Sequence, residues 1–458
     1  MTESVSNSSA ATRRRMFGRA GEAGAGGAAL ALAACGTPGA QEQPGGGLST
    51  KPVTLTWAVR GGGTPEVRTK LLDEYKPLRP NVTVEQFDAS GGIAPSIEKI
   101  AAGLAAGLAL DFINGHLASR QLIESIDAVQ PIDDLVKRDK LDLGKYNKEA
   151  LEATGRYESK LYTLPYAYGG DVAGVAYNKA LFQQAGVKEP SSDWSKPWTW
   201  DEMRQAAVRL TKNEGGVITQ VAFAGFGFWV HTMIMQWGAR WLTPDYKTIT
   251  SDAPQTIDAY LKFTDLVFKD RVFAQSPGAQ LGSGDAFQNG KAAVALPCCA
   301  ALNFARNMRG RNIEWAFITM PKGTVSSLDV SPIVMGVAKA SKQRSEAWDL
   351  MKFMDDKSRL AGAEDRIPAV LPDIQPWVKQ NFAEWPDSKS EMLVEGMKTA
   401  KALEPVRYHA QWQKMSQEIL EPAWKEVMEQ KKSVTDMLKA VKPQLQAVVD
   451  DHARSRRK

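Results

Sequence analysis

The chain has 458 residues and a formal net charge of +5. A folded body of about 400 residues exceeds the size at which a single hydrophobic core keeps growing, so we expect two lobes. The small positive excess does not indicate a nucleic-acid partner. The four histidines have no metal-ligand spacing with one another or with the cysteines, so we predict no metal site.

The first residues have the order of an export signal. A basic cluster at residues 13–15 is followed by a Gly/Ala-rich apolar stretch at residues 23–34. This stretch is far shorter than the roughly 20 residues that span a bilayer. We therefore predict a signal peptide over residues 1–34, of the twin-arginine type, and a flexible tether over residues 35–50, which is rich in Gly, Pro and Gln.

The signal ends in Leu32-Ala33-Ala34-Cys35. This run resembles the lipobox of bacterial lipoproteins. The resemblance implies that Cys35 becomes the mature N-terminus and carries acyl chains. Several acyl chains on one residue hold a protein on a membrane. We therefore expect an exported protein, anchored by lipid to the cell membrane and facing the periplasm or the cell exterior.

Strands and helices alternate after the tether. Residues 53–59 alternate and are rich in β-formers, which predicts a strand. Such alternation favours an α/β architecture with mainly parallel sheets, and places ligand sites at the carboxyl ends of strands. The next expected elements are a helix over 66–76, a strand over 81–87, a helix over 96–108 and a strand over 110–113. Residues 372–449 have Met, Leu and Trp at helical spacings and predict a helical tail.

The middle of the chain resembles extracellular solute-binding proteins of the maltose-binding type. The similarity begins at residues 161–166 (LYTLPY), continues through 174–187 (GVAYNKALFQQAGV) and reaches the Thr-Trp-Asp-Glu run at 199–202. Further blocks with this resemblance lie at residues 285–294, 336–342 and 367–369. The similarity therefore extends from about residue 51 to residue 449.

The resemblance implies a two-lobed, type II periplasmic-binding-protein fold. Each lobe would be a mixed, mainly parallel sheet flanked by helices, with ligand in the cleft between them and hinge closure around it. The first lobe would hold residues 50–170 and 336–366, and the second would hold residues 175–332 and 370–450. The implied function is that of a monomeric substrate-binding lipoprotein, with no enzymatic activity and no cofactor, that delivers a sugar or oligosaccharide to an ABC permease in the membrane. The sequence has no phosphate-binding Gly-x-x-x-x-Gly-Lys-Ser/Thr motif, so the ATPase would be another subunit.

A sugar site needs aromatic faces for the apolar side of the ring and planar polar groups for its hydroxyls. Arg60 and Gly62 follow the first predicted strand, and Asn114 and His116 follow the third. Loops at strand ends suit ligand contacts. A plain turn at Arg60 and a surface position for His116 stay open as competing interpretations.

The first crossing between the lobes supplies two further candidates. Asp171 lies six residues before Tyr177, where the resemblance implies a ligand-binding carboxylate; a hinge-loop turn is the competing interpretation. Tyr166 lies in the same expected loop, together with Tyr168. We predict that Tyr166 and Asp171 contact the ligand.

Aromatic residues supply the remaining candidates. The resemblance implies a stacking segment at Phe228 and Trp229, and a cleft-facing aromatic at Trp412. Trp237 and Trp241 are four residues apart, so one helical face would turn both inward, and core packing competes with a binding role for Trp237. Packing in a helix core likewise competes with a binding role for Trp229.

One departure from the family pattern leaves the ligand open. Many relatives have a tryptophan after the Gly-Lys-Ala-Ala run, where this chain has LPCCA at residues 296–300. A non-sugar solute, such as a polyamine, an amino-acid derivative or an organic phosphate, is therefore an alternative ligand. Two further functions stay open: that of an exported glycosidase, which needs two facing carboxylates, and that of a purely structural surface lipoprotein.

Overall fold

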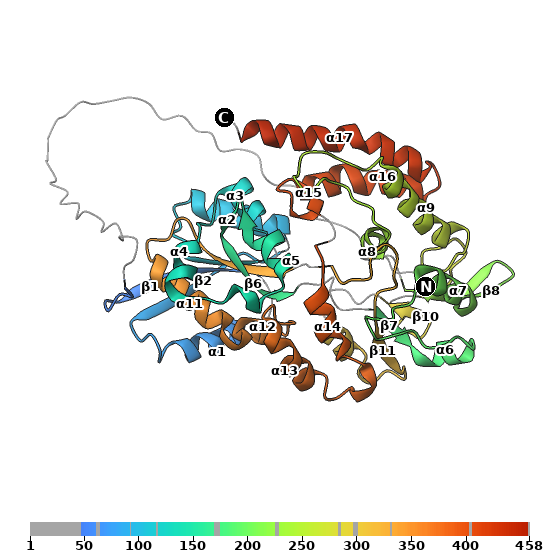
Figure 1. Cartoon of the computed structure of the whole chain (residues 1–458), viewed down its shortest axis with the longest axis horizontal. Helices are drawn as coiled ribbons and strands as arrows, with labels where there is room; N and C mark the ends of the chain where they lie inside the picture. The colour runs from blue at the N-terminus through green and yellow to red at the C-terminus, as the bar shows by residue number, and fades with distance from the viewer. Residues whose placement is uncertain are drawn as a thin grey trace, which may run out of the picture. The chain divides into compact units, whose positions relative to one another are not determined.

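The structure, a computed structural model, describes residues 47–60, 65–91, 93–115, 118–168, 175–224, 229–282, 285–295, 301–329, 332–402 and 405–456. The elements in these ranges form two five-stranded sheets with helices packed around them (Figure 1). This arrangement confirms the predicted mixed α/β fold. Within the described ranges, no helix has both the length and the apolar character needed to cross a membrane.

The first sheet has the strand order β2-β1-β3-β12-β6. Strand β1 pairs in parallel with β2 and β3, whereas β12 runs antiparallel to β3 and β6. Four of its five strands therefore point in one direction, and their carboxyl ends lie at one edge of the sheet. The strands are β1 (Val53–Val59), β2 (Val82–Asp88), β3 (Phe112–Gly115), β6 (Thr163–Tyr168) and β12 (Pro332–Val337).

Helices cover both faces of the first sheet. Figure 1 shows α2 and α3 on one face and α1, α11 and α12 on the other. Trp57, Phe112 and Trp348 are fully buried in this layer, which we call the first lobe. Its helices are α1 (Pro65–Tyr75), α2 (Ile93–Ala105), α3 (Ser119–Ile126), α4 (Asp133–Asp139), α5 (Lys148–Ala150), α11 (Arg344–Asp355) and α12 (Arg359–Ala363). A π-helical turn, η2 (Leu151–Gly155), and a short hairpin of β4 (Arg156–Tyr157) and β5 (Lys160–Leu161) complete it.

The second sheet has the strand order β11-β7-β10-β9-β8. Strands β9 and β10 are parallel, and β7 runs antiparallel to both β10 and β11. Its core is aromatic: the rings of Phe223 and Phe273 stack at 4.8 Å between centroids. The strands are β7 (Val175–Asn178), β8 (Lys212–Glu214), β9 (Val217–Phe223), β10 (Ala292–Ala295) and β11 (Trp315–Ile318).

Helix ends around the second sheet follow local sequence signals. At the start of α7, the Thr199 hydroxyl accepts from the backbone N–H of Glu202, and Glu202 accepts from the backbone N–H of Thr199, which is a capping box. We call the layer around this sheet the second lobe. Its helices are α6 (Lys179–Gln184), α7 (Trp200–Leu210), α8 (Trp229–Gln236), α9 (Pro254–Phe268) and α10 (Ala301–Asn307).

One expectation about these helices is wrong. Helix α8 ends at Gln236, so Trp237 and Trp241 do not share a helical face. Gly238 adopts a φ of +86°, a left-handed conformation that favours glycine and ends the helix. Trp241 is instead a core residue, and its indole N–H donates to the hydroxyl of Tyr260 at 3.0 Å.

The tail from residue 371 is helical, as predicted. Helix α17 begins at a Ser433 cap and packs against α16 and α9 (Figure 1). Because α9 belongs to the second lobe, the last helix is part of that lobe's packing. The tail contains α13 (Leu371–Asn381), α14 (Met392–Thr399), α15 (Trp412–Lys414), α16 (Glu421–Met428) and α17 (Val434–Ser455), with a π-helical turn, η7 (Met415–Leu420), between α15 and α16.

Candidate ligand-binding site

A chain of buried hydrogen bonds joins the carboxyl ends of β1, β3 and β6. The indole N–H of Trp57 donates to Asn114 Oδ1 at 2.9 Å, and Asn114 Nδ2 donates to the Tyr166 hydroxyl at 3.0 Å. The Tyr166 hydroxyl in turn donates to Glu364 Oε2 at 2.8 Å. Asn114 and Tyr166 are only 1% and 2% exposed. These bonds fix the polar groups at this edge of the first sheet in one arrangement.

Two arginines lie beside this chain. Arg60 directly follows β1, and its backbone N–H donates to Asn114 Oδ1 at 3.4 Å. Burial is the main cause that lowers the pKa of the Arg60 guanidinium, and the charge of Arg366 acts in the same direction. Both side chains are half-buried, and the Nε atoms of both are buried without a hydrogen-bond partner in the described structure.

The acid of this network is Glu364, which follows α12. Burial raises the pKa of Glu364 to about 7, against the hydrogen bond from Tyr166 and the charges of Arg366 and Arg60. Its second oxygen, Oε1, is buried and has no partner among the described atoms. We call Arg60, Asn114, Tyr166, Glu364 and Arg366 the strand-end cluster.

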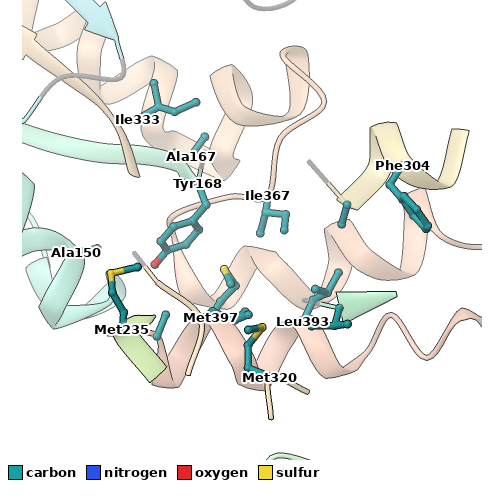
Figure 2. Close-up of a cluster of buried hydrophobic side chains, with 14 of the residues drawn as sticks. Ala150, Ala167, Tyr168, Met235, Phe304, Met320, Ile333, Ile367, Leu393 and Met397 are labelled. Carbon is teal, nitrogen blue, oxygen red and sulfur yellow. The ribbon is translucent and has the colours of Figure 1, made fainter. Parts of the chain in front are cut away.

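Tyr168 places the end of β6 against the second lobe. Figure 2 shows its ring pointing toward Met235 and Met397, which come from α8 and α14. Its hydroxyl is buried without a hydrogen-bond partner among the described residues, and burial raises its pKa. Tyr166 and Tyr168 therefore lie on a buried strand, not in the loop expected from the sequence.

An ion pair joins the turn after α12 to the second lobe. Arg306 on α10 donates to both carboxylate oxygens of Asp365, at 2.6 Å and 3.1 Å. Asp365 lies between Glu364 and Arg366 in the chain. The strand-end cluster therefore lies where the first sheet meets the second lobe, which is the position expected for a ligand site in a two-lobed protein.

The structure brings three predicted residues together: Arg60, Asn114 and Tyr166. It places Trp237 elsewhere, in a pocket of about 430 Å³ at the start of α7, with the ring of Trp200 at 5.1 Å. Trp412 is half-buried at the start of α15 and packs against the core. Ligand contacts of all five residues stay predictions.

Other predicted residues lie outside the described residues. These are Cys35, Gly62, His116, Asp171 and Phe228. Trp229 begins α8, but its side chain also lies outside the described part. Their roles stay predictions. In the described part of the chain, no group of three or more His, Cys, Asp or Glu side chains could hold a metal ion.

Sequence patterns do not reveal Glu364 and Arg366. The only local signal is the neighbouring block at residues 367–369, where a last crossing between lobes is expected. The backbone there pairs with β6, since the N–H of Tyr168 donates to the carbonyl of Ile367 at 2.9 Å. That pairing brings Glu364 to Tyr166 across 198 residues.

A second pocket lies between the lobes. It has a volume of about 580 Å³ and is bounded by Glu149 and Glu152 of the first lobe and by Arg240 and Tyr246 of the second. The two acids already have partners, because Glu149 pairs with Lys401 at 3.4 Å and Glu152 with Arg156 at 3.1 Å. This pocket therefore offers fewer open polar groups than the strand-end cluster.

Two α/β lobes with a buried polar cluster at their boundary define a ligand-binding protein. The sequence matches the bacterial extracellular solute-binding protein family over residues 62–357, and the chain belongs to this family. Among solved structures, the fold is similar to the sugar-binding protein MalE from the phytopathogen Xanthomonas citri (TM-score 0.71, 17% identity, covering 89% of this chain and 100% of that one). It is also similar to an ABC substrate-binding protein of Listeria monocytogenes in complex with cycloalternan (TM-score 0.68, 18% identity, 87% and 100% covered) and to maltose-bound MalE3 of T. maritima (TM-score 0.64, 17% identity, 86% and 99% covered).

Proposed function

We propose that this protein is the substrate-binding component of an ABC importer and captures a sugar or oligosaccharide between its two lobes. The family supports the binding role. The similar folds in complex with cycloalternan and maltose support a saccharide as the ligand. The observation that carries the proposal is the strand-end cluster. It gathers polar atoms without hydrogen-bond partners in the described structure at the boundary of the lobes.

The cluster suits hydroxyl recognition in a specific way. Asn114 and Tyr166 are held by hydrogen bonds on both sides, so they set positions but have little left to offer a ligand. The backbone N–H of Arg60 is bonded to Asn114, whereas the Nε atom of its guanidinium has no hydrogen-bond partner in the described structure. A planar guanidinium can donate to two adjacent oxygens at once. Phe228 and Trp229 would then supply aromatic faces from the second lobe.

Closure of the lobes around the ligand is part of the proposal. The first lobe would comprise residues 50–170 and 336–366, and the second residues 175–332 and 370–450. The antiparallel strand β12 returns the chain to the first sheet, so the lobes are connected by more than one segment. Such connections permit rotation of two rigid bodies about a hinge. A membrane permease would then recognise the closed form.

We also propose that Cys35 anchors the protein to the membrane from outside the cell. The lipobox run that ends at Cys35 and the preceding basic cluster support this location. Mass spectrometry of protein from membranes tests it: acylated Cys35 at the N-terminus is expected. An N-terminus elsewhere, or an unmodified Cys35, would contradict the anchor without affecting the binding proposal.

A thermal-shift screen tests the ligand class. The purified chain is mixed with neutral and acidic saccharides, amino acids, polyamines and organic phosphates. A ligand at a hundredfold excess over its Kd stabilises the native state by about 2.7 kcal/mol, so the Tm of the protein must rise. A rise in Tm with saccharides supports the proposed function. A rise with non-sugars alone would contradict the proposal that the ligand is a saccharide.

A further inference from the structure

Among the described residues, the guanidinium groups of Arg60 and Arg366 have no carboxylate in an ion pair with them. Both Nε atoms are buried without a hydrogen-bond partner in the described structure. Half-buried cations without a partner are unfavourable, because burial removes water that would otherwise solvate them. This pair therefore differs from an ordinary structural arginine.

Neighbouring arginines have the partners that these two lack. Arg306 forms two hydrogen bonds with Asp365, and Arg407 pairs with the buried carboxylate of Asp329 at 3.0 Å. The fold thus neutralises these two arginines with carboxylates. Leaving Arg60 and Arg366 open at one edge of the first sheet is consistent with a counterion that the ligand supplies.

Glu364 compensates only weakly for the positive charges of Arg60 and Arg366. Glu364 lies close enough to both arginines for their charges to act on it, but it forms no ion pair with either. Its Oε2 is already bonded to the Tyr166 hydroxyl. Burial raises its pKa to about 7, so near neutral pH a large fraction of Glu364 is protonated and uncharged. The strand-end cluster therefore carries an excess of positive charge.

A ligand with an anionic group would complete this cluster better than a neutral or cationic one. A carboxylate or phosphate accepts two parallel N–H bonds from a guanidinium, and such charge-assisted bonds are about twice as strong as neutral ones. A neutral sugar would leave both cations uncompensated, and a polyamine would be repelled.

Resting on the proposed function, we propose that the saccharide ligand carries an anionic group, a carboxylate or a phosphate, and that Arg60 and Arg366 bind this group together. The shared chemistry is an oxyanion on a sugar. Sugar acids and sugar phosphates differ in reach and charge, so matched probes distinguish the two sources.

The test is isothermal titration of the full-length chain with three matched sets of probes near pH 7.5. The sets are neutral mono- and disaccharides, the corresponding uronic acids, and the corresponding sugar 6-phosphates. An acidic probe should bind at least about tenfold more tightly than its neutral counterpart. Its affinity should fall in about 1 M NaCl because salt screens the charges.

Four variants and a control assign the binding to these residues. Arg60→Gln and Arg366→Gln should each weaken binding of the acidic probe at least about tenfold, while Arg60→Lys and Arg366→Lys should retain part of it. Arg309→Gln is the control, because Arg309 is an exposed arginine already paired with Glu384. It should leave the affinity unchanged. Thermal melts identify any variant that fails to fold, and the lysine variants then carry the comparison.

Each outcome separates the inference from the proposed function. If neutral saccharides bind as tightly as the acidic ones, the inference that the ligand carries an anionic group is wrong. The proposed saccharide-binding function would stay in place. Acidic probes that bind the Arg60 and Arg366 variants unchanged would overturn the assignment of these residues. Failure of every saccharide to bind would overturn both the inference and the proposed function.

Discussion

His452 Nε2 lies 2.9 Å from a carboxylate oxygen of Glu124, a residue 328 positions earlier in the chain. Glu124 also accepts from Arg456 at 2.7 Å and from Arg120 at 2.6 Å. His452 lies on α17 and Arg456 directly follows this helix, whereas Glu124 and Arg120 lie on α3 of the first lobe. This one carboxylate therefore fastens the end of the chain to the first lobe.

Removal of the Glu124 charge should destabilise the protein. The Glu124 side chain is 3% exposed, so Glu124→Gln leaves three cationic or protonatable groups without their counterion. The expected loss is about 3 kcal/mol in the free energy of unfolding, measured by urea titration. Glu74→Gln is the control, since Glu74 is exposed on α1. Equal stabilities of the two variants would show that Glu124 contributes no more than a surface charge.

His409 should make stability fall in mild acid. Its ring lies 5.3 Å from that of His452, and Glu124 and Arg120 also act on it. Burial lowers the pKa of His409 to about 4, and His452 adds to this effect. The unfolded chain therefore binds a proton between pH 6.5 and 4 that the folded chain does not, so stability is lost as pH falls through this window.

The slope from this single group is at most about 1.4 kcal/mol per pH unit. His409→Asn should flatten the decline, because asparagine keeps an acceptor near Nδ1, which accepts from the N–H of Gln411 at 3.1 Å. Unfolding titrations at several pH values measure the slope. An unchanged slope in the variant would exclude His409 as its source. Glu124 would add to the decline in the native chain, because the His452 hydrogen bond and the nearby arginines, against the effect of burial, hold its pKa below the usual value.

Glu364 should act in the opposite direction. Its folded pKa of about 7 exceeds the ordinary 4.5, so the folded chain binds a proton that the unfolded chain has released, and stability is lost as pH rises through this window. Glu364→Gln removes the loss. The variant should gain roughly 1–3 kcal/mol relative to the native chain between about pH 4.5 and pH 8. A difference that does not change with pH would mean that Glu364 titrates normally.

The hydroxyl of Tyr168 should lower the stability of the folded, ligand-free protein. It is buried among methionines without a hydrogen-bond partner in the described structure (Figure 2). Tyr168→Phe should stabilise the ligand-free protein by about 1 kcal/mol, since an unsatisfied buried polar group is unfavourable. Tyr75→Phe is the control and should destabilise, because the Tyr75 hydroxyl donates to Asp349 at 3.0 Å. If Tyr168→Phe destabilises as much as the control, the hydroxyl has a partner.

The sequence predicts the first lobe's local elements well, because hydrophobic period and turn residues set them. Strand β1 and the helical tail lie where expected. Strand β6 replaces a stretch for which the sequence favours a loop, and Pro165 within it is unusual for a strand. Pro165 pairs with Val334 of β12 beside a register shift in the ladder, and such a bulge tolerates a residue that has no N–H to donate.

The site is harder to predict than the elements. Arg60 and Asn114 follow strands, and strand ends meet at one edge of a sheet, so local signals are enough to place them together. Glu364 and Arg366 arrive through pairing of residues 367–369 with β6, and no local pattern encodes that contact. Helix α8 ends because Gly238 adopts a left-handed conformation. The four-residue spacing of Trp237 and Trp241 predicts a continuing helix instead.

A crystal structure of the chain with its tightest-binding saccharide tests the central claim most directly. The account predicts the sugar at the strand-end cluster, in contact with Arg60 and enclosed by both lobes. A saccharide bound instead in the pocket beside Trp237 at the start of α7, or on one lobe alone with Arg60 and Arg366 untouched, would contradict it.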